Sequence, residues 1–346
     1  MLERQTERRP QVKAIGESDM NSGEHQVSSP FHAGEQAVQT RLGVREQIEK
    51  MGRRMVLNHL PEQHQRFYRS LPFLLIGTTD AQGRPWASLL AGKPGFMTSP
   101  NAYALKVAAR PLFGSPLADG LSVGAEVGLL GILPESRRRN RLAGRVAAMD
   151  ADSITIEVAQ AFGNCPQYIQ TRRIEVLPEV AEPWREKVIE QGDRLNEKAQ
   201  ALIQKSDTMF IATAYKDESG RNSKANPAFS ADISHRGGKP GFVRVEDEQT
   251  LLFPDFSGND IFNTIGNILV NPRAGLLFID FETRDLLYLT GRAEIVWEGS
   301  AVEAFEGAER FVRCRVESWR RVERSLPLKF EFGEYSPNLK RTGSWE

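Results

Sequence analysis

The pentapeptide Gly-Lys-Pro-Gly-Phe occurs twice in this chain, at 92–96 and at 238–242, and it decides how the rest of the sequence is interpreted. A second motif, Gly-Leu-Leu-x-Ile, follows each copy, at 128–132 and at 275–279. In both places a Gly-Arg pair comes sixteen positions after the start of that second motif. Matches that keep both order and spacing indicate an internal duplication.

The pattern of each copy predicts a series of short apolar strands separated by turns. The first opens with Phe-Leu-Leu-Ile-Gly-Thr-Thr at 73–79, and the second with Met-Phe-Ile-Ala-Thr-Ala at 209–214. Asp and Gly mark the turns that follow, at 80–83 and 217–220, with a Ser in the second. Short strands with such turns are typical of a β sandwich or barrel, and they argue against a doubly wound parallel sheet.

The helical patterns lie outside the strand-rich parts and set the domain boundaries. Apolar spacing between 34 and 64 predicts an amphipathic helix that Pro61 ends, and a charged run predicts a second helix over 184–206. A shorter helix is expected around 304–311. The predicted organisation is a disordered arm (1–30), an N-terminal helix with a diverged barrel (31–180), a linker helix (181–206) and a second barrel (207–346).

Composition excludes several classes of function. The 346 residues carry 45 basic and 45 acidic side chains, so no net field favours nucleic acid or an anionic membrane. No apolar run approaches the ~20 residues of a membrane helix. Cys165 and Cys314 lack a metal-knuckle spacing, so we expect no metal site and reduced thiols in a cytoplasmic protein, although a single disulfide stays open.

The turn of the second copy carries a candidate anion site. Ser-His-Arg-Gly-Gly-Lys at 234–239 places three basic-capable side chains around two glycines, which let backbone approach a ligand closely. Next, the run 251–253 ends in Pro-Asp-Phe-Ser-Gly-Asn at 254–259, and a helical pattern begins at Asp260. The N–H groups of a helix start, with Arg and Lys nearby, suit a phosphate.

These motifs identify a resemblance. The second copy resembles the pyridoxamine-phosphate-oxidase-like, FMN-binding split barrels, through the pieces at 210–214, 234–242, 253–259 and 271–280. The first copy looks like a diverged relative. From about residue 30 to 345 the chain is similar to the amino-terminal part of bacterial proteins that continue into a ferredoxin-reductase-like flavin and iron–sulfur module.

The resemblance implies antiparallel, Greek-key barrels with flavin mononucleotide (FMN) in a groove between two of them. The fold class is therefore mainly β (α+β): two tandem antiparallel Greek-key split barrels with flanking helices. The two barrels are expected to form an internal pseudo-dimer, or the chain a homodimer. A small-molecule substrate or electron donor, and a ferredoxin-reductase-like partner, are the implied partners.

Carried over position by position, the resemblance gives a set of cofactor-binding residues. Phosphate ligands are expected at Arg236, Lys239 and Arg244. Asp255, Phe256, Ser257 and Asn259 are expected beside the ribityl chain and the ring, with Asn263 and Thr264 on the helix and Lys224 as a further cation. At 259–260 the sequence has Asn-Asp where simpler oxidases of the family place a lysine.

Structural roles compete with each of these assignments. The glycine turn could be a plain hairpin, and Ser257 and Asn259 could only cap the helix. The arginines at 137–139 and 141 could form a solvated face or reach the flavin site of the other copy. Cys165 is interpreted as a packed thiol rather than a nucleophile.

The leading hypothesis is an FMN-binding flavoprotein that acts as a flavin-dependent oxidoreductase. No catalytic acid or base stands out, and the sequence has no Gly-x-Gly-x-x-Gly after a strand. Electrons would therefore come from reduced nicotinamide that diffuses to the flavin, or from a partner reductase. The alternative is a non-enzymatic module that binds or carries flavin or haem.

Overall fold

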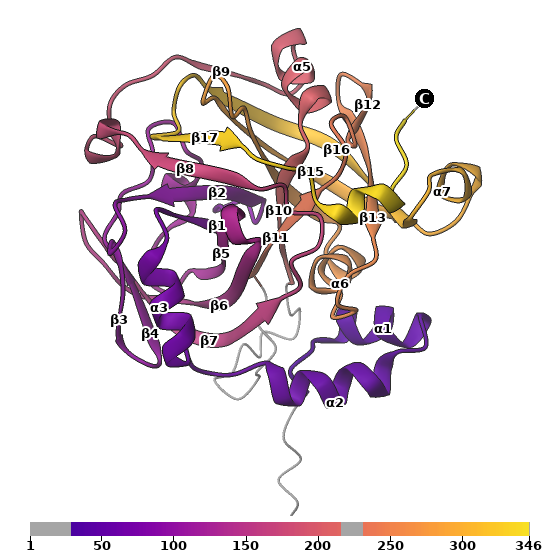
Figure 1. The fold of residues 1–346 in the computed structure, drawn as a ribbon, viewed down its shortest axis with the longest axis horizontal. Coiled ribbons are helices and arrows are strands. Elements are labelled where there is room, and N and C mark those ends of the chain that lie inside the picture. Colours follow the sequence, from indigo (N-terminus) through magenta and orange to yellow (C-terminus); the bar gives the residue numbers. More distant parts are fainter. Residues whose placement is uncertain (1–28, 216–230, 346) are drawn as a thin grey trace, which may run out of the picture.

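Two antiparallel sheets, each curled into a split barrel with helices at its edges, make up the computed structural model, which describes residues 29–215 and 231–345 (Figure 1). The predicted fold class, mainly β with antiparallel split barrels, is confirmed. The first 28 residues of the predicted arm, the predicted turn at 217–220 and Lys224 lie outside the described residues.

Within the described residues, seven strands form the main path of each sheet, and an eighth, β9, joins the second. The first sheet contains β1 (Phe73–Thr79), β2 (Pro85–Ala91), β3 (Met97–Asn101), β4 (Ala104–Val107), β5 (Glu126–Leu133), β6 (Arg138–Met149) and β7 (Ile154–Asn164). The second contains β10 (Thr208–Ala214), β11 (Ala231–Gly237), β12 (Arg244–Asp247), β13 (Thr250–Phe256), β14 (Arg273–Ile279), β15 (Leu286–Val296) and β16 (Ala308–Val322). A separate two-stranded sheet pairs β8 (Arg172–Val176) with β17 (Leu328–Phe332).

The two large sheets share one strand order. The first runs β2-β1-β5-β6-β7-β4-β3 and the second β11-β10-β14-β15-β16-β13-β12, so each strand corresponds to the strand nine places later. Registers correspond as well, because Leu75 pairs with Leu130 as Phe210 pairs with Leu277. The motif 128–132 therefore occupies the same place in β5 as 275–279 does in β14.

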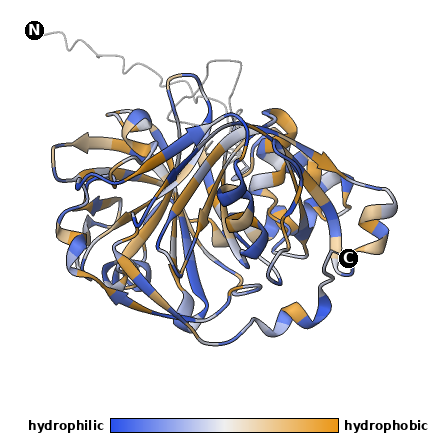
Figure 2. Cartoon of the chain, turned by 90° about the horizontal axis from the view of Figure 1, so that it is seen from above, coloured by the Kyte–Doolittle hydropathy of each residue, from blue (hydrophilic) through white to orange (hydrophobic). Residues whose placement is uncertain are grey.

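The first strand of each barrel is apolar on both faces because both faces are buried. Successive side chains of a strand point to opposite sides. In β1, Leu74 and Ile76 pack inside their own barrel, whereas Phe73 and Leu75 join a core shared with the other barrel. Figure 2 shows this as hydrophobic colour along the central strands. Three layers of apolar side chains result: one in each barrel and one between them.

The repeated Gly-Leu-Leu motif is explained by the contact between the barrels. A Cβ atom on Gly128 would lie 2.7 Å from the Cα atom of Asp232, and one on Gly275 would lie 2.3 Å from the carbonyl oxygen of Pro85. Both obstacles are backbone of the opposite barrel, which a side-chain rotation cannot clear. Glycine at these two positions therefore lets the sheets approach each other closely.

The single helix predicted between 34 and 64 is wrong. The chain forms α1 (Ala33–Arg41), α2 (Arg45–Met55) and α3 (Glu62–Ser70) there. Gly43, at φ 72°, turns the chain between α1 and α2. Pro61 precedes α3 as its N-terminal cap residue rather than ending a helix, a place that proline tolerates well.

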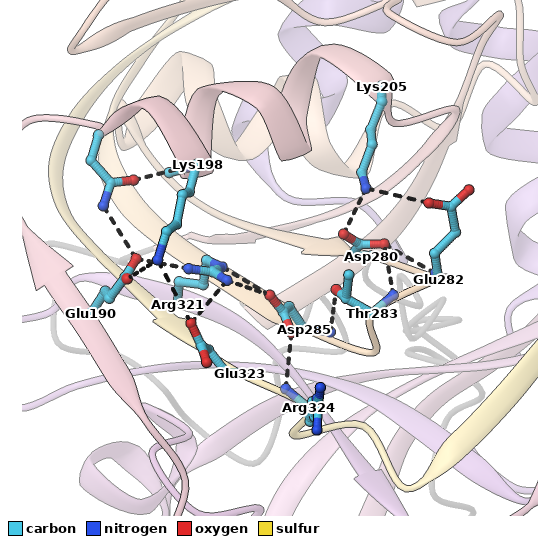
Figure 3. Close-up of polar contacts among 12 residues, drawn as sticks. Glu190, Lys198, Lys205, Asp280, Glu282, Thr283, Asp285, Arg321, Glu323 and Arg324 are labelled. Carbon is cyan, nitrogen blue, oxygen red and sulfur yellow. Dashed lines mark hydrogen bonds and ion pairs between the residues drawn. The ribbon is translucent and has the colours of Figure 1, made fainter.

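The predicted linker helix is also shorter than expected. Only α5 (Glu197–Lys205) is helical, starting where the Asn196 side chain accepts a hydrogen bond from the N–H of Ala199. Before it, β9 (Ile189–Gly192) pairs with β16. Figure 3 shows what holds β9 there: Arg321 of β16 contacts Glu190 at 2.7 Å and the buried Asp285 at 2.7 Å. Pairing with the sheet overrides the helical preference of this charged segment.

The helix expected around 304–311 is displaced. A short helix, α7 (Ser300–Ala304), comes before it, and β16 already begins at Ala308. The remaining helices are α4 (Leu117–Gly120) and α6 (Asn263–Val270). Within 29–215 and 231–345, none of the helices combines the length and apolar character that crossing a membrane requires.

We expect Gly275→Ala to lower the free energy of unfolding by about 1–3 kcal/mol, because the added methyl group meets backbone that must shift. Chemical denaturation measures this loss. Gly163→Ala is the matched control, since the nearest atom to a Cβ at this strand glycine is 3.9 Å away. Equal stability of the two variants would contradict the close approach of the barrels.

Candidate functional site

A cleft opens between the barrels, where β6 faces β11 and the start of α6. The first barrel contributes Arg139, Arg141, Asn164 and Cys165 to its wall. From the second barrel come six of the residues that the sequence predicted: Arg236, Asp255, Phe256, Asn259, Asn263 and Thr264. Residues more than 100 positions apart thus meet in one concave site.

Four of the predicted residues are not part of this wall. The ammonium group of Lys239 donates to the carbonyl oxygen of Thr342 at 2.6 Å. Arg244 lies on β12, an edge strand, with its guanidinium over the ring of Trp345. Ser257 is exposed outside the cleft lining. Lys224 falls outside the described residues.

The sequence left Arg139 and Arg141 undecided between a solvated face and the site of the other barrel, and the structure places both in the cleft. They are two residues apart on β6, so they project from the same face of the strand. Their neighbour Arg137 turns away: its Nε atom donates to the carbonyl oxygen of Ile169 at 2.9 Å. The alternation Arg-x-Arg was the sequence signal for this pair.

Positive charge is concentrated in the cleft. Burial, and then the charge of Arg236, lower the pKa of Arg139 to about 10. Burial, followed by the charges of Arg139 and Arg236, lowers the pKa of Arg141 to about 9. Such shifts mean that three guanidinium groups lie close enough to repel one another in a site with little water.

Two carboxylates balance part of that charge. Asp232 forms an ion pair with Arg141. Asp255 lies 3.3 Å from Arg236 but is also bound, at 2.7 Å, by the buried Arg310. No carboxylate among the described residues pairs with Arg139, whose Nε atom donates to the carbonyl oxygen of Cys165. The Nε atom of Arg236 is buried, and no atom of the described residues accepts a hydrogen bond from it.

Polar side chains behind the arginines are tied together. One oxygen of Asp232 accepts hydrogen bonds from Ser234 at 3.2 Å and from Thr264 at 3.1 Å. The side-chain oxygen of Asn263 accepts from Arg141 at 2.9 Å. These contacts join β6, β11 and α6 and hold the guanidinium of Arg141 at the cleft wall.

The start of α6 differs from the sequence prediction. The helix begins at Asn263, not at Asp260, and no side chain caps it. Asp260 and Phe262 both adopt left-handed backbone conformations, at φ 58° and 63°. This turn brings Asn259 to Asn164, and their side chains are hydrogen-bonded at 2.7 Å across the two barrels. The predicted capping by Ser257 and Asn259 is therefore wrong.

His235 and the cysteines have other environments. His235 alternates with Arg236 along β11 and points away from the cleft, edge-on to Phe210 in the core between the barrels. Burial lowers the pKa of His235 well below its usual range. Both cysteines are free thiols. No cluster of His, Cys, Asp and Glu that could hold a metal ion occurs in the described ranges.

The two barrels have the same strand order, so a second position between them is equivalent to the cleft. That position is apolar. By strand register, Arg236 corresponds to Leu90, Arg139 to Leu286 and Arg141 to Tyr288. All three counterparts are fully buried, Leu90 in the core of the first barrel and Leu286 and Tyr288 in the core between the barrels. The duplication has therefore kept a polar cleft at one of its two equivalent positions and filled the other with hydrophobic side chains.

Residues 195–332, from two residues before α5 to the end of β17, match the family model described as pyridoxamine 5'-phosphate oxidase. This segment, which is less than half of the chain, is similar to that family. The family segment supplies Arg236, Asp255 and Asn263, while the remaining arginines of the cleft come from the barrel before it.

Solved structures that resemble the chain cover about one barrel each. A putative pyridoxamine 5'-phosphate oxidase from Lactobacillus delbrueckii is 16% identical over 37% of this chain and 94% of its own, with a TM-score of 0.28. HupZ from Group A Streptococcus is 19% identical over 36% and 90%, with a TM-score of 0.27. A FAD-binding protein from Mesorhizobium loti is 14% identical over 39% and 98%, with a TM-score of 0.24. No curated protein matches the chain.

Two buried titratable groups lie behind the cleft, at the start of α1. Burial raises the pKa of Glu35 to about 8, in spite of the nearby Arg141. Burial lowers the pKa of His32 to about 4. Both groups are therefore neutral in the folded protein at pH 7, although Glu35 is ionised in an unfolded chain.

We expect the free energy of unfolding to fall as pH rises from about 7.5 to 8.5, by up to about 1 kcal/mol per pH unit. At the start of this range the folded protein still holds most of the Glu35 proton, which an unfolded chain has already lost, whereas His32 is neutral in both states. Denaturation at several pH values measures the slope. Glu35→Gln removes it and Glu46→Gln, at an exposed site of α2, retains it; a slope that survives in Glu35→Gln would refute this origin.

Proposed function

We propose that the cleft binds FMN and that the protein is a flavin-dependent oxidoreductase. The observation that carries this proposal is the cluster of Arg139, Arg141 and Arg236, whose charges two carboxylates balance only in part. A phosphate would remove the repulsion among the guanidinium groups and accept the unused N–H of Arg236. The family match of residues 195–332 supports a flavin as the molecule that carries this phosphate group.

The cleft wall offers suitable partners for the other parts of FMN. Asn259 and Asn263 carry amide groups that can bind the hydroxyls of the ribityl chain. Phe256 lies at the wall with its ring 5.1 Å from that of Tyr168, and this aromatic pair would border the flavin ring. The phosphate assignment moves from Lys239 and Arg244 to the arginines of β6, which the first barrel provides.

Both barrels contribute to this single site, which supports an internal pseudo-dimer as the functional unit. Bound FMN would supply two-electron redox chemistry, and the chain would anchor its phosphate and orient its ring. Reduced nicotinamide or a ferredoxin-reductase-like partner would be the electron donor, since the sequence has no dinucleotide fingerprint of its own. A small organic molecule would be the acceptor at the open side of the cleft.

We expect the protein to keep a flavin absorbance spectrum after it is loaded with FMN and the unbound FMN is removed. The amount of bound FMN should be close to one molecule per chain. We expect one site per chain because, among the described residues, the equivalent position carries Leu286 and Tyr288 in place of the two arginines of β6. Anaerobic addition of NADH or NADPH, alone and with a ferredoxin reductase, should then bleach the flavin band. A flavin that neither donor reduces would indicate a carrier, and a Soret band on adding haem instead of flavin would contradict the proposal.

Arg139→Ala and Arg236→Ala should each raise the Kd for FMN roughly tenfold or more, because each removes a charge-assisted hydrogen bond to phosphate worth about 1.5–3 kcal/mol. Quenching of flavin fluorescence measures the affinity. Riboflavin, which lacks the phosphate, should bind both variants as it binds the wild-type protein. Arg244→Ala is the control, because Arg244 lies over Trp345 away from the cleft. Equal losses for FMN and riboflavin would refute the phosphate assignment.

A further inference from the structure

The first helix reaches the cleft wall from outside both barrels. Figure 1 shows α1 beneath α6, and the two helices cross at a pair of glycines. A Cβ atom on Gly34 would lie 2.2 Å from the carbonyl oxygen of Gly266, and one on Gly266 would lie 2.6 Å from the backbone nitrogen of Glu35. This crossing inserts Glu35 against the first turn of α6, where only 3% of its surface is exposed.

The carboxyl group of Glu35 uses both oxygen atoms. One accepts a hydrogen bond from the backbone N–H of His32 at 2.9 Å, which closes a capping box at the start of α1. The other accepts from the side-chain amide of Asn263. Asn263 then turns its oxygen atom toward Arg141, which donates to it at 2.9 Å. Arg141 can only donate, so Asn263 presents its oxygen atom to Arg141 and its amino group to Glu35, and the contact with Glu35 holds the amide in this orientation.

We propose that Glu35 is a positioning residue of the cleft, which orients Asn263 and through it holds Arg141 for the phosphate of the ligand. The inference rests on the proposed FMN site. It adds to that site a residue of α1, a helix that lies outside the segment matched by the family model. Glu35 does not line the cleft itself, so its effect on the ligand passes through Asn263.

The charge state of Glu35 then bears on the ligand. Arg141 faces it from β6 and Arg45 from α2, and neutral His32 lies beside it on α1. Across the cleft wall Asp232 of β11 already pairs with Arg141, and Arg139 and Arg236 lie near Arg141. If Glu35 ionises, Arg141 faces a second carboxylate, and less of its positive charge remains for an anion.

The decisive experiment compares FMN and riboflavin binding at pH 7 and pH 8.5, a range that crosses the ionisation of Glu35 near pH 8. For the wild-type protein we expect the FMN affinity to fall at least threefold, with riboflavin unchanged. Glu35→Gln, which mimics the neutral side chain, should keep the FMN affinity of pH 7 and abolish the pH dependence, whereas Glu35→Ala, which removes the contact with Asn263, should weaken FMN binding about fivefold at pH 7. The control Glu46→Gln should behave as the wild-type protein does.

A double-mutant cycle separates positioning from a general structural role. If Glu35 acts through Asn263, then Glu35→Ala should cause no further loss of FMN affinity in an Asn263→Ala background. Additive losses, or a wild-type FMN affinity that is the same at both pH values, would overturn the role of Glu35 and leave the FMN site intact. A wild-type protein that binds no FMN would overturn both the FMN site and the role of Glu35. If a Glu35 variant fails to fold, the pH profile of the wild-type protein still tests the role of Glu35.

Discussion

The close contact between the two barrels is the constraint on which the rest of the structure depends. Strands β1 and β10 bury both faces, one in their own barrel and one in the shared core, and Gly128 and Gly275 let the opposite backbones approach. Apolar strands buried on both sides cannot be exposed at acceptable cost, so neither barrel can rotate away from the other. This fixed orientation brings β6 of the first barrel opposite β11 of the second and thereby creates the cleft.

The duplication makes two equivalent positions, and the chain has given them opposite character. At one, Leu90 packs in the core of the first barrel and Leu286 and Tyr288 pack in the core between the barrels, whereas arginines occupy the corresponding places at the other. Burying several guanidinium groups together is unfavourable unless anions accompany them. Asp232 and Asp255 balance only part of this positive charge, so the cleft favours an anionic ligand. One of the two equivalent positions thus contributes to the hydrophobic cores, and the other is the proposed binding site.

The elements outside the barrels are joined to this frame by polar contacts. On one side, Arg321 fixes β9 to the second barrel through Glu190 and Asp285. On the other, α1 crosses α6 at a glycine pair, and Glu35 contacts the same asparagine that holds Arg141. The site is therefore composite: the second barrel carries the family motif, the first supplies cations, and the N-terminal helix supports the wall between them.

The sequence by itself predicted the repeated strand pattern and the antiparallel β class, because these depend on short-range patterns. The family resemblance assigned Arg236, Asp255 and Asn263 to a cofactor site, and the three residues lie in one cleft. It misplaced Lys239 and Arg244, since a turn and an edge strand direct those side chains to the C-terminal segment. The sequence pattern predicted helices where β9 and β16 form, because strand pairing with distant residues outweighs local propensity. Only the tertiary structure decided that Arg139, Arg141 and Glu35 belong to one site, since their proximity to β11 and α6 arises from packing across more than 90 residues of intervening chain.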